Sequence, residues 1–231
     1  MTIVEHLYEL RHRLVVSVLA LLVGALISFF FYNSILHLLM TPYRSIFHKQ
    51  KFLTTDPLGG FAIRLKVAGY SGLFLASPVV MWQLWRFITP GLSNKEKRYA
   101  VPFVTASVLL FLVGAAVAMV TLKPALNFLG HVGGPSLDQF WEANKYLGLI
   151  LLMIIAFGVA FEFPILLVFL ELAGVVPSSR LRKWRRPAIV VIVIVAAVIT
   201  PSQDPFSLFA MAIPMYIFYE ASILVGRLMK K

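Results

Sequence analysis

Long stretches without charged residues alternate with short polar segments along most of this chain. About 20 apolar residues are needed for a helix to cross a bilayer, and we predict six spans on that basis: residues 14–32, 67–85, 101–122, 147–170, 188–199 and 206–225. The fifth stretch makes only about 18 Å of helix at about 1.5 Å per residue. Either the bilayer is thinner there, or the last two spans form a hairpin that does not reach the far face. The pattern predicts an all-α integral membrane protein in which residues 1–231 form one membrane domain.

Prolines divide this pattern. Six of them fall at span edges, where proline starts or stops helices: Pro90, Pro102, Pro124, Pro187, Pro201 and Pro205. Pro78, Pro164 and Pro214 fall inside spans, and each frees a backbone carbonyl that neighbouring helices or water must satisfy. Three kinked helices favour a concave bundle, although each kink is also tolerable without a function. In the loop of residues 33–66, the apolar residues 35–40 are expected to lie along the membrane interface, in a structured cap, and to end at Pro42.

Composition excludes a soluble domain. Hydrophobic residues make up 60% of the chain and charged residues 13%, against about 45–50% and about 25% in ordinary soluble proteins. A net charge of +11 would suggest nucleic acid in a soluble domain, but these bases flank apolar stretches, where they orient spans and contact anionic lipid. We therefore predict a lipid bilayer as partner and no nucleic acid. Cysteine is absent, which excludes disulfides and a thiol nucleophile.

The distribution of bases also predicts the orientation. Of the 21 Lys and Arg residues, two thirds lie on the side of the membrane that both termini share in the six-span arrangement. The positive-inside rule then places both termini in the cytoplasm.

The motifs of common enzymes are missing. The chain has no phosphate-binding glycine loop, no zinc-protease helix motif and no serine-hydrolase motif. An intramembrane hydrolase would need Ser with His, or two Asp, at membrane depth, and neither pair is present. We predict no metal, no cofactor and no enzymatic activity.

Glu162 is the most informative acid, because it lies inside the fourth predicted span. An ionisable residue at that depth is a functional-site hypothesis by default, and a packing hydrogen bond between helices is the alternative. Glu171 and Glu220 are placed near span ends, from which they reach the interface. A proton-coupled small-molecule transporter that uses Glu162 is the alternative function. Such transporters have internal repeats, and we find none.

Three acids lie on the predicted cytoplasmic face. Glu5 and Glu9 are four residues apart and so share one side of a helix. Glu96 is the only acid between the second and third spans, among the bases Lys95, Lys97 and Arg98. Such carboxylates commonly form solvated ion pairs. They would equally suit a cationic peptide that presents a guanidinium, which makes two parallel hydrogen bonds to one carboxylate.

Five stretches, in order along the chain, resemble one known family. They are HLYELRHR at 6–13, PVVMWQLWRFITPG at 78–91 followed by Glu96, FGVAFEFP at 157–164, Thr200-Pro201 with Asp204, and IPMY at 213–216. The chain is similar, from about residue 3 to residue 226, to TatC, the multi-spanning receptor subunit of the twin-arginine protein translocase. It departs from the family pattern near Asp204, where Leu208 follows Ser207 in place of a common Gln.

This resemblance implies a fold and a function. The fold is a glove-like bundle of six spans with two short last helices, in a bacterial-type cytoplasmic (inner) membrane. The function is binding of twin-arginine signal peptides and transport of folded proteins with single-span TatA and TatB partners, driven by the proton gradient, in a receptor complex of several copies. The resemblance implies that Glu96 and Glu9 bind the arginine pair, and that Glu162 faces a polar interior. Further functional positions that it implies are Pro42, Gln83, Phe87 and Asp204.

Overall fold

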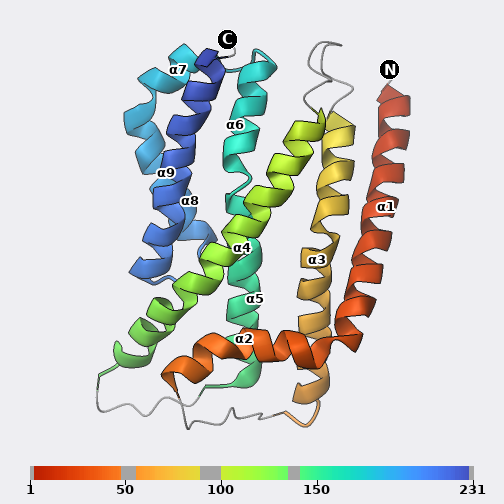
Figure 1. The fold of residues 1–231 in the computed structure, drawn as a ribbon, viewed down its shortest axis with the longest axis vertical. Helices are drawn as coiled ribbons and strands as arrows, with labels where there is room; N and C mark the ends of the chain where they lie inside the picture. The colour runs from red at the N-terminus through yellow and green to blue at the C-terminus, as the bar shows by residue number, and fades with distance from the viewer. Residues whose placement is uncertain (1–2, 48–55, 89–99, 135–140, 229–231) are drawn as a thin grey trace.

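The computed structural model describes residues 3–47, 56–88, 100–134 and 141–228. Every element in these ranges is an α-helix (Figure 1). The helices are α1 (Ile3–Phe30), α2 (Tyr32–Ile46), α3 (Gly59–Ile88), α4 (Ala100–His131), α5 (Ala143–Ala160), α6 (Phe163–Leu172), α7 (Ser178–Lys183), α8 (Arg185–Ile199) and α9 (Pro205–Leu228). Figure 1 shows both termini at one end of the bundle, and α2 lying across the opposite end.

Five of these segments are long and apolar enough to cross a membrane: α1, α3, α4, the pair α5 and α6, and α9. Each of them extends past the charge-free stretch that we used to predict it. The largest difference is at α1, which begins at Ile3 and includes the whole polar segment before the first predicted span. The prediction of an all-helical membrane fold is therefore correct, and most of these helices are longer than the charge-free stretches within them.

Helix α8 corresponds to the fifth predicted span and is indeed short. It has 15 residues, or about 22 Å of helix. It begins at Arg185, because Trp184 separates it from α7, and it ends before Thr200, whose backbone is extended. Pro201 follows Thr200 directly in the sequence at this same end.

Two prolines do not act as we predicted. Pro42 lies inside α2 and Pro124 lies inside α4, and both helices continue past them. In each case large side chains are buried on both sides of the proline, such as Leu39 and Tyr43 around Pro42. Packing therefore holds the helix in place despite the missing hydrogen bond.

The prolines inside spans also differ from one another. The carbonyl of Phe74, which Pro78 frees, accepts a hydrogen bond of 2.7 Å from the Ser77 hydroxyl of the same helix. Pro164 does not kink a continuous helix but lies in the first turn of α6, directly after a break at Phe161 and Glu162. This break places Glu162 at the first turn of α6, where its backbone carbonyl accepts a bond of 3.1 Å from the Ile165 amide.

Small residues allow the helices to approach closely. A Cβ atom on Gly72 of α3 would lie 2.4 Å from the Ala25 nitrogen of α1, and one on Gly24 would lie 2.5 Å from the Gly72 carbonyl oxygen. A Cβ on Gly114 of α4 would similarly lie 2.6 Å from the Phe157 carbonyl oxygen of α5. Close approach at glycine is a common way for helices to associate within membranes, where no hydrophobic force drives them together.

An aromatic cluster closes the end of the bundle opposite the termini. The Tyr43 ring of α2 lies 5.2 Å from that of Tyr146 and 5.1 Å from that of Phe47, and Trp141 packs 5.5 Å from Phe47, between ring centroids. The Tyr146 hydroxyl donates a hydrogen bond of 2.8 Å to the Leu39 carbonyl. These contacts connect α2 to α5, so α2 belongs to a structured cap.

Candidate functional site

The first candidate site lies between α1 and α3, at the end of the molecule where both termini lie. The Arg13 guanidinium donates a hydrogen bond of 3.1 Å from Nε to Glu9 Oε1, and Nη2 of the same group makes a second, short contact to this oxygen. Its Nη1 donates across to Gln83 Oε1 of α3, at 3.1 Å. One turn nearer the N-terminus, the His6 ring stacks on Phe87 with centroids 4.4 Å apart.

This arrangement brings together three of the predicted residues: Glu9, Gln83 and Phe87. The fourth, Glu96, lies outside the described residues. Sequence reasoning missed Arg13 and His6 as members of the site. The four-residue spacing of Glu9 and Arg13 was a usable signal, because such pairs meet on one helix face, whereas nothing in the sequence pairs His6 with Phe87.

The second oxygen of Glu9 distinguishes this site from an ordinary ion pair. Oε2 is buried and has no hydrogen-bond partner among the described residues. The Glu9 and Arg13 side chains are only 18% and 15% exposed, so water screens their charges less than it does at an open surface. A carboxylate oxygen without a partner is costly when buried, and a second guanidinium is a ligand that would satisfy it.

The second candidate site surrounds Glu162 and joins three helices. The Trp85 indole of α3 donates a hydrogen bond of 2.8 Å to the Ser107 hydroxyl of α4, and Ser107 in turn hydrogen-bonds the Glu162 carboxyl group. Ser107 is fully buried and Trp85 is 3% exposed. Sequence reasoning missed both partners, because they come from helices far away in the sequence.

The carboxyl group of Glu162 makes one packing contact between helices and has one oxygen that is still able to accept a hydrogen bond. Its Ser107 bond is the interhelical hydrogen bond that the packing alternative predicts. Its Oε1, however, is buried without a partner among the described residues. The aromatic rings of Phe103 and Phe169 pack against Trp85, with centroids 4.9 and 5.5 Å away, and fix the indole that supports Ser107.

Asp204 and Pro42 lie outside both candidate sites, where their surroundings indicate a role in the fold. Asp204 is 1% exposed and caps α9, since its Oδ1 accepts a bond of 2.8 Å from the Ser207 amide. Its Oδ2 accepts a bond from the Ser202 hydroxyl. Pro42 lies in α2, which crosses the end of the bundle opposite the termini (Figure 1).

The remaining acids of the predicted spans differ from each other. Glu220 pairs with Arg185 of α8 at 2.6 Å. Glu171 does not reach the interface as we predicted: it is 1% exposed, and its carboxyl group packs against Gly226 of α9, where a Cβ would lie 2.4 Å from Oε2. The reason is the close α6–α9 contact that this glycine allows.

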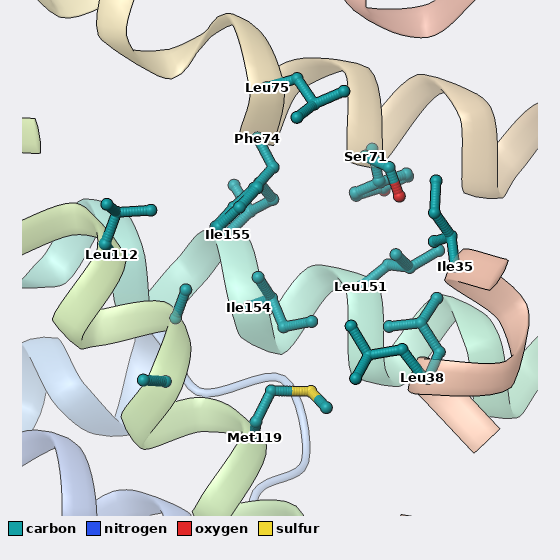
Figure 2. Close-up of a pocket in the computed structure, with 14 residues that line it drawn as sticks. Ile35, Leu38, Ser71, Phe74, Leu75, Leu112, Met119, Leu151, Ile154 and Ile155 are labelled. Carbon is teal, nitrogen blue, oxygen red and sulfur yellow. The ribbon is translucent and has the colours of Figure 1, made fainter. Parts of the chain in front are cut away.

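A groove of about 400 Å³ opens between α2, α3, α4 and α5. Figure 2 shows its lining, in which aliphatic and aromatic side chains such as Leu38, Phe74 and Ile154 point toward one another. Tyr70 and Ser71 contribute the polar atoms, and Glu162 is not among the lining residues. The groove therefore suits an apolar chain and gives no support to a proton-coupled site for a polar small molecule at Glu162.

In the part of the chain that the structure describes, no three His, Asp or Glu residues lie close enough together to bind a metal ion.

Comparison with known proteins gives a consistent result. A model of the family described as "Sec-independent protein translocase protein (TatC)" matches residues 5–214. A protein of that name from Aquifex aeolicus is 37% identical, and the alignment covers 99% of this chain and 95% of the relative. A further one from Frankia casuarinae is 38% identical, and the alignment covers 98% of this chain but only 65% of that longer protein.

Solved structures match equally well. The crystal structure named "Twin Arginine Translocase Receptor- TatC" has a TM-score of 0.80 at 35% identity, and the match covers 98% of this chain and all of the other. The same receptor in DDM has a TM-score of 0.82 at 36% identity, with 96% and 99% covered.

Proposed function

Because the chain belongs to the TatC family of Sec-independent protein translocase proteins, we propose that it is the receptor that captures twin-arginine signal peptides of folded cargo. Its family makes it a membrane component of protein transport rather than an enzyme. In this proposal it works in the cytoplasmic membrane of a bacterial-type cell, in a complex of several copies. Single-span TatA- and TatB-type proteins are its partners, and the proton gradient drives transport.

The observation that carries this proposal is the state of Glu9. One carboxylate oxygen is held by Arg13, whose guanidinium is itself fixed by Gln83, and the other is buried without a partner. A guanidinium of the peptide would donate to this second oxygen. Arg13 thus orients the Glu9 carboxylate and leaves its Oε2 atom available to the ligand.

Glu96 is the second carboxylate of the proposal. It lies in the segment that joins the end of α3 to the start of α4, and α3 carries Gln83 and Phe87 near that same end. Two adjacent arginines of a peptide need two carboxylates within a short distance of each other. The close packing of α1 on α3 is what brings the Glu9 side of such a pair to this end.

The position of this end also supports a proposed orientation of the chain in the membrane. Both termini lie there (Figure 1), and the segments that the six-span arrangement assigns to this side contain two thirds of the bases of the sequence, so we place this end in the cytoplasm. Two bases of the opposite end have specific contacts. Arg64 lies 4.4 Å from the Phe29 ring centroid, and Lys66 donates a bond of 3.2 Å to the Asn144 carbonyl. These contacts give Arg64 and Lys66 a packing role that is compatible with the proposed orientation.

Glu162 has a separate role in this proposal: it serves transport of cargo and not capture of the peptide. Its carboxyl group lies inside the bundle, with one oxygen unpartnered among the described residues. The Trp85–Ser107 pair holds the other side of the group in one position.

Binding of short peptides to the purified chain tests the proposal. We expect a twin-arginine peptide to bind, and its twin-lysine version to bind at least tenfold more weakly, because an ammonium group cannot make two parallel bonds to the carboxylate proposed at Glu96 and presents no rigid planar donor to the one open oxygen of Glu9. Loss of one partner of a partly buried charge pair costs about 2–5 kcal/mol. Glu96→Ala should therefore reduce affinity more than tenfold, and Glu9→Ala by less.

The matched control is Glu142→Ala, which removes the same charge at the opposite end, where Glu142 pairs with the exposed Lys145 at 3.1 Å. This variant should bind like the parent. An affinity of Glu96→Ala within twofold of the parent, or equal affinity for the two peptides, would refute the assignment.

A further inference from the structure

A basic pocket lies between α7 and the end of α9, away from both candidate sites. Its volume is about 390 Å³, and it is lined by Ser178, Ser179, Arg182, Lys183 and Arg227. In Figure 1, α7 lies on the opposite side of the bundle from α1, at the same end as the C-terminus.

The pocket is a fixed feature, because α7 is fastened to α9. Leu181 of α7 is 5% exposed and Ser178 is 7% exposed, so one face of this short helix is part of the protein interior. The Tyr219 hydroxyl of α9 donates a hydrogen bond of 2.6 Å to the Leu181 carbonyl. Arg182 and Lys183 follow directly in the sequence and remain exposed.

The bases of this pocket carry charge that no acid in the described part of the chain neutralises. Residues 180–186 contain five bases. Arg185 is paired with Glu220, whereas no ion pair of the described residues includes Arg182, Lys183 or Arg227. Three cationic groups that converge without a counter-charge favour an anion with several oxygen acceptors, such as a phosphate group.

The position of the pocket relative to the membrane favours a lipid headgroup over other molecules that carry a phosphate group. Helix α8 starts directly after α7 and is only about 22 Å long, against about 30 Å of hydrocarbon. The bases at its start are therefore drawn toward the headgroup layer. Trp184 between the two helices is 56% exposed, as is typical of aromatic residues at the membrane interface. Exposed apolar side chains such as Val190 and Ile194 continue along α8, where acyl chains would lie.

We propose that this pocket binds the phosphate headgroup of an anionic phospholipid. Arg182 and Arg227 donate hydrogen bonds to the phosphate oxygens, Lys183 adds charge, and the Ser179 hydroxyl supplies a further donor. Basic pockets at the end of a helical bundle are a known way to bind such headgroups. This site is separate from peptide capture and does not depend on it.

The test uses the purified full chain in a mild detergent, with bound lipid counted by native mass spectrometry. Phosphatidylglycerol, phosphatidylcholine and inorganic phosphate are the three probes. We expect phosphatidylglycerol to bind at least fivefold more tightly than phosphatidylcholine. Arg182→Gln and Arg227→Gln should each weaken phosphatidylglycerol at least fivefold.

The control is Arg186→Gln, which removes the same charge from the same basic segment but outside the pocket. It should change affinity less than twofold. An equal loss in all three variants would mean a diffuse charge effect and would overturn the proposal. So would phosphatidylcholine binding as tightly as phosphatidylglycerol, or inorganic phosphate at 1 mM displacing the lipid, which would identify a site for soluble anions.

Discussion

Replacing Gly72 by alanine will force α1 and α3 apart. The added Cβ would lie 2.4 Å from the Ala25 nitrogen, 2.6 Å from its Cα and 2.9 Å from its Cβ. The nearest two of these atoms are backbone, so no side-chain rotation relieves the overlap. Restoring ordinary contact requires a separation of about 1 Å between the two helices.

The cost follows from two opposing contributions. Overpacking of this kind typically destabilises a protein by about 1–3 kcal/mol. Replacing a helical glycine by alanine returns about 0.5–1 kcal/mol. We therefore expect Gly72→Ala to lower the free energy of unfolding by up to about 2.5 kcal/mol. It should also weaken twin-arginine peptide binding, because the Arg13–Gln83 bond of 3.1 Å crosses the same interface and is lost when the atoms move beyond about 3.5 Å.

Gly69→Ala supplies the control in the same helix. A Cβ on Gly69 would meet nothing within 4 Å, so this variant gains helix propensity without overlap. Thermal unfolding in detergent and peptide affinity should be measured for both. A melting temperature of Gly72→Ala equal to or above that of Gly69→Ala would show that the α1–α3 contact does not have the closeness described.

Three further variants test other parts of the chain. Glu162→Gln should fold and bind peptide like the parent, and cargo export in cells then measures whether a titrating carboxyl is needed; normal export by Glu162→Ala would support packing alone. Asp204→Ala removes the cap of α9 and should lower stability by about 0.5–2 kcal/mol in thermal unfolding, without changing peptide affinity. Tyr146→Phe removes the hydroxyl that donates to the Leu39 carbonyl and should cost about 0.5–1.5 kcal/mol by the same measurement.

Helix existence could be predicted from the sequence, because a long apolar stretch is a local property. Helix extent could not, because a membrane helix continues into water for as long as its backbone bonds are satisfied. Thus α1 includes Glu5 and Glu9, which a search for charge-free residues excludes. The errors at Pro42 and Pro124 have a different origin. Proline preference is local, but burial of Leu122 and Leu126 around Pro124 is decided by the tertiary structure.

The two candidate sites also differ in whether their contacts are local in the sequence. The Glu9–Arg13 pair lies within one helix turn and could be predicted from its spacing. The partner of Glu162 could not, since Ser107, to which Trp85 donates, reaches it only where three helices meet. No periodicity in the sequence encodes that contact. An acid inside an apolar stretch predicts that a partner exists without naming it.

A cationic ligand and a basic receptor surface are compatible once geometry is considered. Bases lie close in the sequence to both acids of the proposed peptide site, such as Arg13 near Glu9 and Lys95 and Lys97 beside Glu96, so a loose cation gains little there. Within the site, however, Arg13 already holds one oxygen of Glu9 and leaves the other fixed and dehydrated. A guanidinium is less strongly hydrated than an ammonium group and presents its donors in a rigid plane, so it loses less on entering. Positive charge near the site thus lowers the affinity for every cation. The oriented carboxylate offsets this repulsion only for a ligand that matches its geometry. Selectivity for arginine over lysine then arises from the same contacts that reduce non-specific binding.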